Sequence, residues 1–251
     1  MPLLLQAILV LLINIHLQSG ASVDFKSEQL KYSRVRQAYR ENEDAVKALL
    51  KQQSISPENL EIFLRIFKRP GIIELWGRNK ENKTFTRLKE YKFCATSGDL
   101  GPKRKQGDYQ IPEGFYFIDR FNPTSNFYLS LGINYPNQSD LILGDSQNPG
   151  GDIFIHGNCV TIGCIPITDP LIRELYVFAV EAKNHGQDKI SVHIFPDLLD
   201  DGNFERLCAE YAGDRNLEGF WSNLKESYDY FKSNRSIPSV EISAEGRYIF
   251  N

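Results

Sequence analysis

A series of short runs rich in aromatic and β-branched residues constrains the fold of this chain most. The runs are separated by turn-forming stretches such as Gly77-Arg78-Asn79 and Asn122-Pro123. Short runs of this composition, bounded by turn formers, are typical of β-strands. The sequence therefore predicts a β-rich body. Its expected strands lie within residues 72–76, 84–96, 114–119 and 127–132.

The part of the chain before residue 71 carries helical signals instead. Apolar residues recur at helical spacing between residues 33 and 53. Ser56-Pro57 combines a capping residue with proline at the first helical position, so we expect a second helical segment that ends before Pro70-Gly71. Residues 22–70 are therefore expected to form an N-terminal helical region.

Helical periodicity returns after the strand-like runs. Thr168-Asp169-Pro170 is expected to begin a helix that ends at Gly186, and residues 189–195 alternate in the manner of a strand. Amphipathic stretches within residues 204–231 and a short β-like end follow. We therefore expect an α+β, β-rich fold with a body over residues 71–197 and a helical C-terminal extension over residues 198–251.

The first 21 residues differ from the rest. No residue from Met1 to Ala21 carries a charged side chain, and the run from Leu3 to Ile13 is apolar except for Gln6. About 20 apolar residues are needed to span a bilayer, so this run is short. Because Ser19-Gly20-Ala21 offers the small residues of a cleavage site, we expect a secretory signal peptide over residues 1–21. The chain would then be exported to the periplasm or cell envelope, without stable membrane insertion after cleavage; an uncleaved anchor is the alternative.

Charge and cysteine content restrict the remaining function classes. The net charge is −3, with 29 basic against 32 acidic residues, so binding to nucleic acid through its phosphates is not expected. Four cysteines are too few for a disulfide scaffold in a chain of this size. Cys94 and Cys208 are interpreted as small buried hydrophobic residues. Cys159 is interpreted in the same way, with a regulatory disulfide to Cys164 as the alternative.

The stretch IFIHGNCVTIGCIPITD, residues 153–169, carries the strongest chemical signal. An apolar run ends at His156-Gly157, and Gly163-Cys164 follows eight residues after the histidine. A cysteine nucleophile needs a base or charge partner at neutral pH, and imidazole is the usual one. A glycine before the cysteine lets the backbone approach a substrate carbonyl. Spacing alone makes this a weak signal for catalysis.

The same stretch resembles the catalytic motif of the YkuD-type L,D-transpeptidases, in which His-Gly is followed by Ser/Thr-x-Gly-Cys. His156-Gly157 matches the first part and Thr161-Ile162-Gly163-Cys164 the second. Residues 97–119 are similar to the family's substrate-side hairpin. The segments YPNQSD, NHGQDKISVHIFP and FLRIFK resemble the YafK-like branch, as do Ile162 and Pro166 at positions where many other members carry His and Arg. The resemblance covers roughly residues 33–196 and implies a mixed β-sandwich that cradles one helix, with residues 71–197 as the catalytic domain.

The resemblance also implies roles for individual residues. Cys164 would be the nucleophile, and His156 would hold the thiolate as an ion pair and later protonate the leaving amine. The Gly157 carbonyl would orient the imidazole, and amides near Gly163 and Cys164 would form the oxyanion hole. Thr161 would hydrogen-bond within the loop or contact substrate.

The implied function is a cysteine-dependent L,D-transpeptidase that acts on peptidoglycan stem peptides through an acyl-enzyme. The alternative is a murein hydrolase, an L,D-endopeptidase or amidase that releases murein-attached protein or peptide with the same Cys-His pair. A non-catalytic murein-binding module would be expected to lack Cys164 or His156, and both are present. No cofactor is implied.

Two further groups of residues have alternative interpretations. Lys103, Arg104 and Lys105 form a basic run that is either a solvated hairpin tip or a contact for stem-peptide carboxylates. His193 is expected on the polar side of its strand. A zinc site is not expected because no CxxC or HExxH spacing is present. Its ligands would have to be His156, Cys159, Cys164 and His193.

Overall fold

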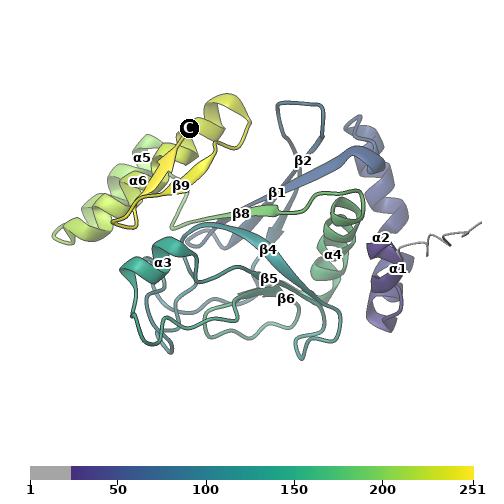
Figure 1. The fold of residues 1–251 in the computed structure, drawn as a ribbon, viewed down its shortest axis with the longest axis horizontal. Helices are drawn as coiled ribbons and strands as arrows, with labels where there is room; N and C mark the ends of the chain where they lie inside the picture. Colours follow the sequence, from purple (N-terminus) through teal and green to yellow (C-terminus); the bar gives the residue numbers. More distant parts are fainter. Residues whose placement is uncertain (1–23) are drawn as a thin grey trace, which may run out of the picture.

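The structure is a computed structural model that describes residues 24–251. The expected signal peptide over residues 1–21 lies outside the described residues. Helices lie on both sides of a curled sheet (Figure 1). The helices are α1 (Phe25–Gln29), α2 (Ser33–Gln52), α3 (Gln138–Leu143), α4 (Asp169–Asn184), α5 (Asp201–Glu210) and α6 (Arg215–Asn234), with a 3-10 turn, η1 (Pro57–Asn59). The strands are β1 (Leu60–Phe67), β2 (Ile72–Asn79), β3 (Thr86–Lys92), β4 (Gly114–Asn122), β5 (Ser130–Ile133), β6 (Phe154–His156), β7 (Ile165–Pro166), β8 (Ile190–Phe195), β9 (Val240–Ile242) and β10 (Tyr248–Phe250).

Eight of these strands form one mixed sheet in the order β3-β2-β1-β8-β4-β5-β6-β7, and β9 and β10 form a separate hairpin. The pairs β1–β8 and β6–β7 are parallel, and the other pairs in the large sheet are antiparallel. This arrangement confirms the expected α+β, β-rich class with a mixed sheet and helices before and after it.

The central strand β1 is buried on both faces. Its even-numbered apolar residues, Ile62, Leu64 and Ile66, join a core with α2 and α4. Phe63 and Phe67 face the other way and pack with residues of α6. Figure 1 shows α4, α2 and α1 on one side and α5 and α6 on the other. The helix α4 is buried along residues 174–182, as expected of a helix covered by a sheet and by α2.

The expected second helical segment after Ser56-Pro57 is wrong. Only the single turn η1 is helical, and the chain then enters β1 at Leu60. The misassignment has a physical reason, because a strand covered on both faces reads as a continuous apolar run without strand alternation. Proline at the first position suits a 3-10 turn as well as a helix, and the Ser56 side chain makes no capping hydrogen bond.

The expected position of His193 is also wrong. Its side chain is 3% exposed and lies edge-on to the rings of Phe63 and Phe115, each 4.6 Å away between centroids. The polar face expected for β8 does not exist, because β8 lies between β1 and β4 and the C-terminal helices cover its second face. Burial lowers the pKa of His193 well below its usual range, with a further contribution from the nearby Arg65 charge.

The two edges of the eight-stranded sheet are joined to each other. Cys94, just after β3, forms a disulfide with Cys159, which precedes β7. The Cys94 amide also donates to the Pro166 carbonyl at 3.1 Å. The interpretation of Cys94 and Cys159 as unpaired core residues is therefore wrong, because their pairing depends on the curl of the sheet, which spacing along the chain does not reveal.

A buried polar cluster ties the C-terminal helices to the body. Glu113 is fully buried and pairs with the Lys68 ammonium at 3.0 Å, while it accepts a hydrogen bond from Trp221 Nε1 at 2.8 Å. Lys68 also donates to the carbonyls of Gly101 and Ile111. The cluster thus holds both ends of the loop 101–111 against α6. In the described part of the chain, no helix is long and apolar enough to cross a bilayer.

Replacing Glu113 tests this cluster. We expect Glu113→Gln to lower the free energy of unfolding by about 3 kcal/mol, because it leaves the buried Lys68 ammonium without its counter-charge. Urea unfolding followed by circular dichroism measures the change. Glu81→Gln, in the exposed turn after β2, is the matched control and should change stability by less than about 0.5 kcal/mol. Equal stabilities for the two variants would contradict a stabilising role for the cluster.

Candidate active site

His156 ends β6 and is held from several sides. Its side chain is 1% exposed and lies against the ring of Phe127, with 4.7 Å between centroids. Ser130 of β5 and Pro166 of β7 are its register partners. Its carbonyl accepts a hydrogen bond from the Ile167 amide at 2.8 Å. The imidazole therefore has little freedom to reorient.

The Gly157 carbonyl selects the tautomer of His156. His156 Nδ1 lies 2.5 Å from the Gly157 oxygen, and because a carbonyl only accepts, Nδ1 carries the proton. In the neutral ring Nε2 is then free to accept a proton. Glycine is required at position 157, since a Cβ there would lie 2.5 Å from Asp169 Oδ1 and 3.1 Å from the Phe127 oxygen.

Cys164 lies directly before β7. The parallel register pairs Ile155 with Ile165 and His156 with Pro166, so Cys164 is level with Phe154. Because side chains two residues apart on a strand share a face, the Cys164 and His156 side chains project from the same face of the sheet. The pairing of β6 with β7 thus places the two predicted reactive residues on adjacent segments of the sheet. The Cys164 thiol donates to the Asp152 carbonyl at 3.6 Å.

Burial favours the neutral forms of both the Cys164 thiol and the His156 imidazole. Burial raises the pKa of Cys164, although a hydrogen bond from the Phe154 backbone opposes this effect. Burial lowers the pKa of His156, although the bond to Gly157 opposes it. These two directions run against the expected thiolate–imidazolium ion pair, because both charged forms lose hydration on burial. The ion pair therefore stays a prediction that titration of Cys164 can test.

The loop between the two residues is held by its own hydrogen bonds. The Thr161 hydroxyl donates to the Cys164 carbonyl at 2.9 Å and accepts from the Gly163 amide at 3.2 Å. The Gly163 amide is therefore already engaged, which leaves the Cys164 amide as the candidate oxyanion donor. Gly163 has φ +130°, and a Cβ there would lie 3.0 Å from the Gln110 carbonyl. Only glycine fits this contact between the loop and residues 97–112.

Two features of this loop were not apparent from the sequence. The Cys94–Cys159 disulfide fixes the loop at its midpoint. Asp169, in the first turn of α4, accepts a hydrogen bond from the Asn158 amide at 2.8 Å, and Asn158 has a positive φ of 61°. In the sequence, the disulfide was signalled only by an even number of cysteines, which does not say which cysteines pair. The Asp169 contact was signalled only by an acidic residue at the start of a helix, which does not identify Asn158 as its partner. Because Cys159 is in the disulfide, it is not available as the zinc ligand considered above.

The basic run lies on a long loop between β3 and β4 and not on the tip of a hairpin. Lys103 is 4% exposed, and its ammonium donates to Asp108 at 2.6 Å and to the Lys105 carbonyl at 2.9 Å. Its charge lies near enough to Cys164 to favour the thiolate. Lys105 is exposed. The alternative of a solvated tip is therefore wrong for Lys103, because Asp108 draws its ammonium inward.

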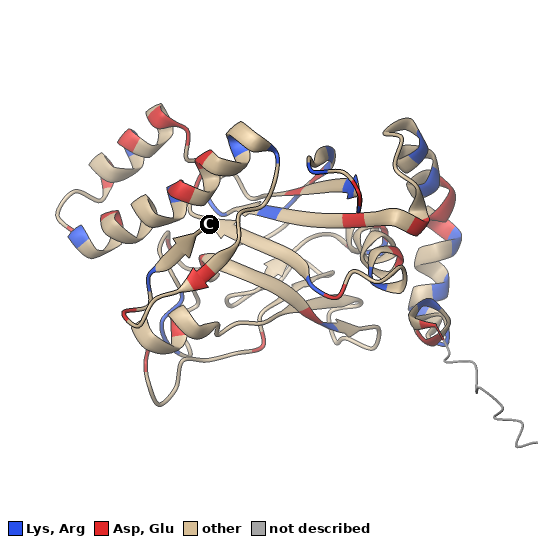
Figure 2. Cartoon of the chain, turned by 45° about the horizontal axis from the view of Figure 1, so that its top comes forward, with Lys and Arg blue, Asp and Glu red and all other residues tan. Residues whose placement is uncertain are grey.

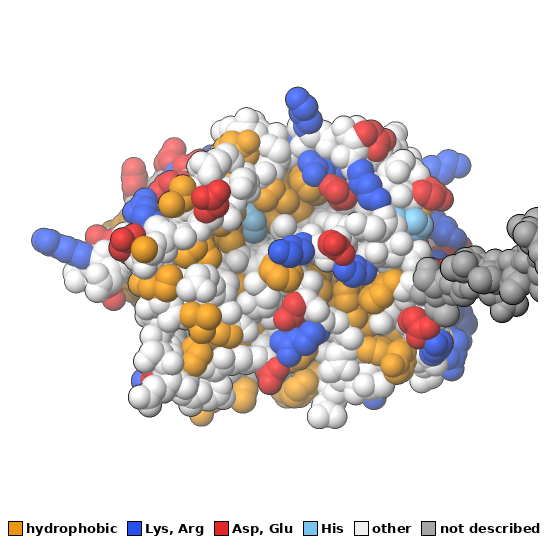
Figure 3. Space-filling model, viewed as in Figure 1, with side chains coloured by type: hydrophobic (Ala, Val, Ile, Leu, Met, Phe, Trp, Pro, Cys, Tyr) orange, Lys and Arg blue, Asp and Glu red, His pale blue; other side chains and the backbone are white. Residues whose placement is uncertain are grey.

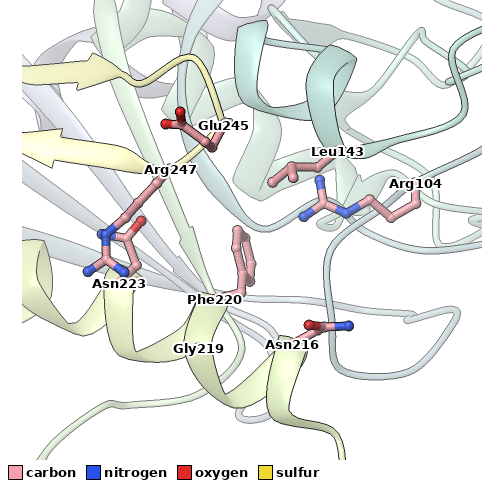
Figure 4. A pocket seen from close by; sticks show the side chains of 9 residues that line it. Arg104, Leu143, Asn216, Gly219, Phe220, Asn223, Glu245 and Arg247 are labelled. Carbon is pink, nitrogen blue, oxygen red and sulfur yellow. The ribbon is translucent and has the colours of Figure 1, made fainter.

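Arg104 points away from this cluster. Its guanidinium lies 5.2 Å from the Phe220 ring and 3.5 Å from Asp140. It lines a cavity of about 470 Å³ formed with α6 and the β9–β10 turn (Figure 4). Lys103 and Arg104 are adjacent in the sequence but thus contact different parts of the molecule.

The titration of Cys164 tests the neutral pair. We expect the rate of Cys164 alkylation by iodoacetamide to keep rising above pH 8.5, the ordinary thiol value, because burial disfavours the thiolate. Stopped-flow alkylation of a Cys208→Ala protein between pH 5 and 11 isolates the signal from Cys164. A rate that levels off below pH 7 would show that the thiolate is already formed and would contradict the neutral pair.

Comparison with known proteins adds to this geometry. The YkuD family model, described as the L,D-transpeptidase catalytic domain, matches residues 73–193. The chain is 37% identical over 190 residues to "Putative L,D-transpeptidase YafK" of Escherichia coli strain K12, and equally to that of strain O157:H7, covering 75% of this chain and 73% of the relative. Among solved structures, the helical cell shape determining protein Pgp2 from Campylobacter jejuni is similar with a TM-score of 0.44 and 18% identity over 74% of this chain and 73% of that chain. Bdellovibrio bacteriovorus Bd1075 is similar with a TM-score of 0.40 and 19% identity over 68% and 60%. The identity with the Escherichia coli relatives and the family match show that this chain belongs to the YkuD L,D-transpeptidase family.

Proposed function

We propose that this protein is a cysteine-dependent L,D-transpeptidase that acts on peptidoglycan stem peptides through an acyl-enzyme on Cys164. One observation carries the proposal. The Gly157 carbonyl locks His156 Nδ1, which leaves Nε2 as a proton acceptor on the face of β6–β7 from which Cys164 also projects. Membership of the L,D-transpeptidase family supplies the substrate class.

The proposed reaction starts from a neutral Cys164–His156 pair, the state that burial favours. As the Cys164 sulfur attacks the substrate amide carbon, its proton passes to His156 Nε2, so that thiolate and imidazolium form only during the reaction. The Cys164 amide then faces the developing oxyanion. Collapse of the tetrahedral intermediate breaks the C–N bond, and the imidazolium gives its proton to the leaving amine. The products of this half-reaction are a thioester on Cys164 and a neutral His156.

The second half-reaction returns the enzyme to its starting state. An acceptor amine attacks the thioester, His156 Nε2 takes the proton of that amine, and the Cys164 sulfur leaves and is reprotonated by the imidazolium. If water takes the place of the amine, the same residues carry out hydrolysis, which is the murein hydrolase alternative. The acceptor therefore decides between transfer and hydrolysis, and the release of a murein-attached protein belongs to the hydrolytic case.

The disulfide supports an exported location for this chemistry. Disulfides form and persist in oxidising compartments and are rare in the cytosol. The Cys94–Cys159 bond holds the loop that carries Thr161 and Gly163, so the reduced protein would lose a constraint on its proposed site. We therefore propose that the protein acts in the periplasm or cell envelope, in agreement with the signal peptide expected over residues 1–21.

Removing the thiol tests the mechanism. We expect Cys164→Ala to lower turnover at least about 1000-fold, because the Thr161 hydroxyl of the same loop is a weaker nucleophile that two hydrogen bonds already engage. Incubation with defined muropeptides and mass spectrometry of the products measures this loss and separates crosslinked from hydrolysed products. Wild-type protein should also show a mass increase at Cys164 equal to the mass of the acyl donor less that of the released amine.

Cys208→Ala is the matched control, since Cys208 is the other free cysteine among the described residues and lies on α5. It should keep most of the activity and the thermal stability. Wild-type turnover in Cys164→Ala with an intact circular dichroism spectrum would rule out the thiol mechanism.

Lys103 is proposed as the ligand for a stem-peptide carboxylate. An ammonium has three donors, and Asp108 and the Lys105 carbonyl use two of them. A charge-assisted bond to a ligand contributes about 1.5–3 kcal/mol, so we expect Lys103→Met to raise KM about tenfold. We also expect a lower Tm, because Asp108 loses its buried partner. Steady-state kinetics on a soluble muropeptide and thermal unfolding measure the two effects.

Arg104→Ala and Lys105→Ala are the controls, because each removes one positive charge from the basic run and leaves the Lys103 ammonium in place. Arg104 points into the cavity beside α6, and Lys105 is exposed, so both variants should change KM by less than about threefold. If Lys105→Ala has the larger effect on KM, the carboxylate ligand is Lys105, and the role proposed for Lys103 is wrong.

A further inference from the structure

Arg65 places a positive charge inside the molecule, away from the proposed active site. It lies in β1, two residues before the strand ends at Phe67, and is 5% exposed. As an odd-numbered residue of this strand it faces the C-terminal helices, on the opposite face of the sheet from α4. A guanidinium stays charged in proteins, and a buried charge is costly unless it is paired and hydrogen-bonded. The N–H groups of the Arg65 guanidinium therefore require acceptors close by.

Glu74 satisfies only one edge of the Arg65 guanidinium. Arg65 Nη1 lies 3.4 Å from Glu74 Oε2, a long distance for a buried ion pair. Glu74 is also shared with Trp76 Nε1 at 2.9 Å and with the Arg87 guanidinium at 3.6 Å. Among the described residues, Arg65 Nε and Nη2 have no hydrogen-bond partner. These two N–H groups form the edge of a guanidinium that binds two oxygens of one anion.

Aromatic rings surround the guanidinium without replacing the absent acceptor. The rings of Phe67, Phe195, Tyr228 and Phe231 lie 4.7–5.6 Å from its central carbon. Such contacts stabilise the charge through the ring quadrupole. They offer no oxygen to the in-plane N–H groups, so the unpaired edge remains.

Arg65 lines a cavity with an excess of positive charge. The cavity has a volume of about 620 Å³ between β1–β3 and the end of α6, on the side of the sheet that α5 and α6 cover in Figure 1. Arg87, Lys232 and Arg235 also line it, against Glu74 as its one carboxylate. Arg87 has a second partner in Glu90, whereas Lys232 and Arg235 form no ion pair within residues 24–251.

The C-terminal end of α6 explains the presence of two of the four cations that line the cavity, but not of the other two. Lys232 is in the last turn of α6, and Arg235 is its C-terminal capping residue. The dipole of a helix stabilises positive charges at this end. Arg65 and Arg87 come from the sheet, so the dipole of α6 does not account for their presence beside the same cavity. The cavity is also far larger than a single ion, and Trp76, Phe85 and Tyr228 form an aromatic part of its wall.

We propose that this cavity binds the phosphate group of an organic phosphate monoester. Arg65 Nε and Nη2 donate to two phosphate oxygens, Lys232 and Arg235 neutralise the remaining charge at the mouth, and the aromatic wall contacts the organic part. A doubly charged phosphate matches the cation excess better than a single carboxylate does. Because Nε and Nη2 are covered in this structure, the proposed binding requires a neighbouring side chain to move away from this edge of the guanidinium. The site is separate from Cys164 and does not depend on the proposed reaction.

Calorimetric titration of the mature protein with glycerol 3-phosphate tests the proposal. We expect one site per chain, and we expect Arg65→Met to raise Kd about tenfold or more, because bonds to a charged group are lost. If Arg65→Met fails to fold, the exposed rim variants Lys232→Gln and Arg235→Gln keep the test possible, and each should raise Kd about threefold or more. Arg247→Gln is the matched control, since Arg247 is an exposed arginine of the β9–β10 turn paired with Glu226. It should leave Kd unchanged.

Anion controls decide the ligand class. Sodium chloride at equal ionic strength should produce no saturable heat, and acetate should bind at least about tenfold more weakly than inorganic phosphate. Phosphate heats no larger than those of chloride, or equal weakening in Arg247→Gln and the rim variants, would overturn the proposal. Acetate binding as tight as phosphate would overturn the phosphate class.

A vesicle experiment distinguishes the source of the phosphate. Vesicles of phosphatidylcholine with phosphatidic acid present a lipid phosphate monoester, and vesicles of phosphatidylcholine alone are the control. Cosedimentation that requires phosphatidic acid and is lost in Arg235→Gln supports a lipid headgroup. Binding of glycerol 3-phosphate without cosedimentation supports a soluble ester. Cosedimentation that is unchanged in Arg235→Gln would overturn a role of this cavity in it.

Discussion

The junction between the two edges of the curled sheet is the constraint on which the proposed active site depends. β3 and β7 are the first and last strands of the sheet, and the Cys94–Cys159 disulfide and the Cys94–Pro166 backbone bond join the segments beside them. A disulfide across a separation of 65 residues typically contributes about 2–4 kcal/mol, mainly by restricting the unfolded chain. Because the bond falls inside the loop between His156 and Cys164, the same link that closes the sheet also holds the loop that places the thiol.

Around this junction, each chemical group is supported by a different element. β6 places His156, the backbone of Gly157 sets its tautomer, and the first turn of α4 fixes Asn158 through Asp169. The long loop between β3 and β4 brings Lys103 near the thiol. That loop is anchored by Lys68 and Glu113, two buried charges on β1's end and before β4. The C-terminal helices contribute indirectly, because Trp221 of α6 bonds to the same Glu113 carboxylate.

Local patterns in the sequence predicted the elements whose signals are local. The α4 helix, the strand at residues 189–195 and the motif at His156-Gly157 and Gly163-Cys164 all lie within short stretches. The structure places the first part of the motif at the end of β6 and the second part directly before the paired strand β7. Features that depend on distant parts of the chain were misjudged. Residues 60–67 carry no alternation because both faces of β1 are covered, and His193 is buried by helices that follow it in the sequence. The disulfide and the burial of Lys103 depend on contacts that only the folded chain creates.

The parallel pairing of β1 with β8 determines when the sheet can assemble. β1 ends at residue 67, and its partner β8 begins at residue 190, so more than 120 residues separate the two strands at the centre of the sheet. During synthesis from the N-terminus, β1 and β2 therefore emerge long before β8, the strand that lies between β1 and β4 in the sheet. Parallel pairing over such a separation is slow, because the entropy of closing the intervening chain is lost before the contacts form. Until residues 190–195 have emerged, the edge of β1 that later pairs with β8 has no partner from this sheet. An unpaired strand edge is open to pairing with other chains, so the sheet passes through this exposed state until late in synthesis or translocation.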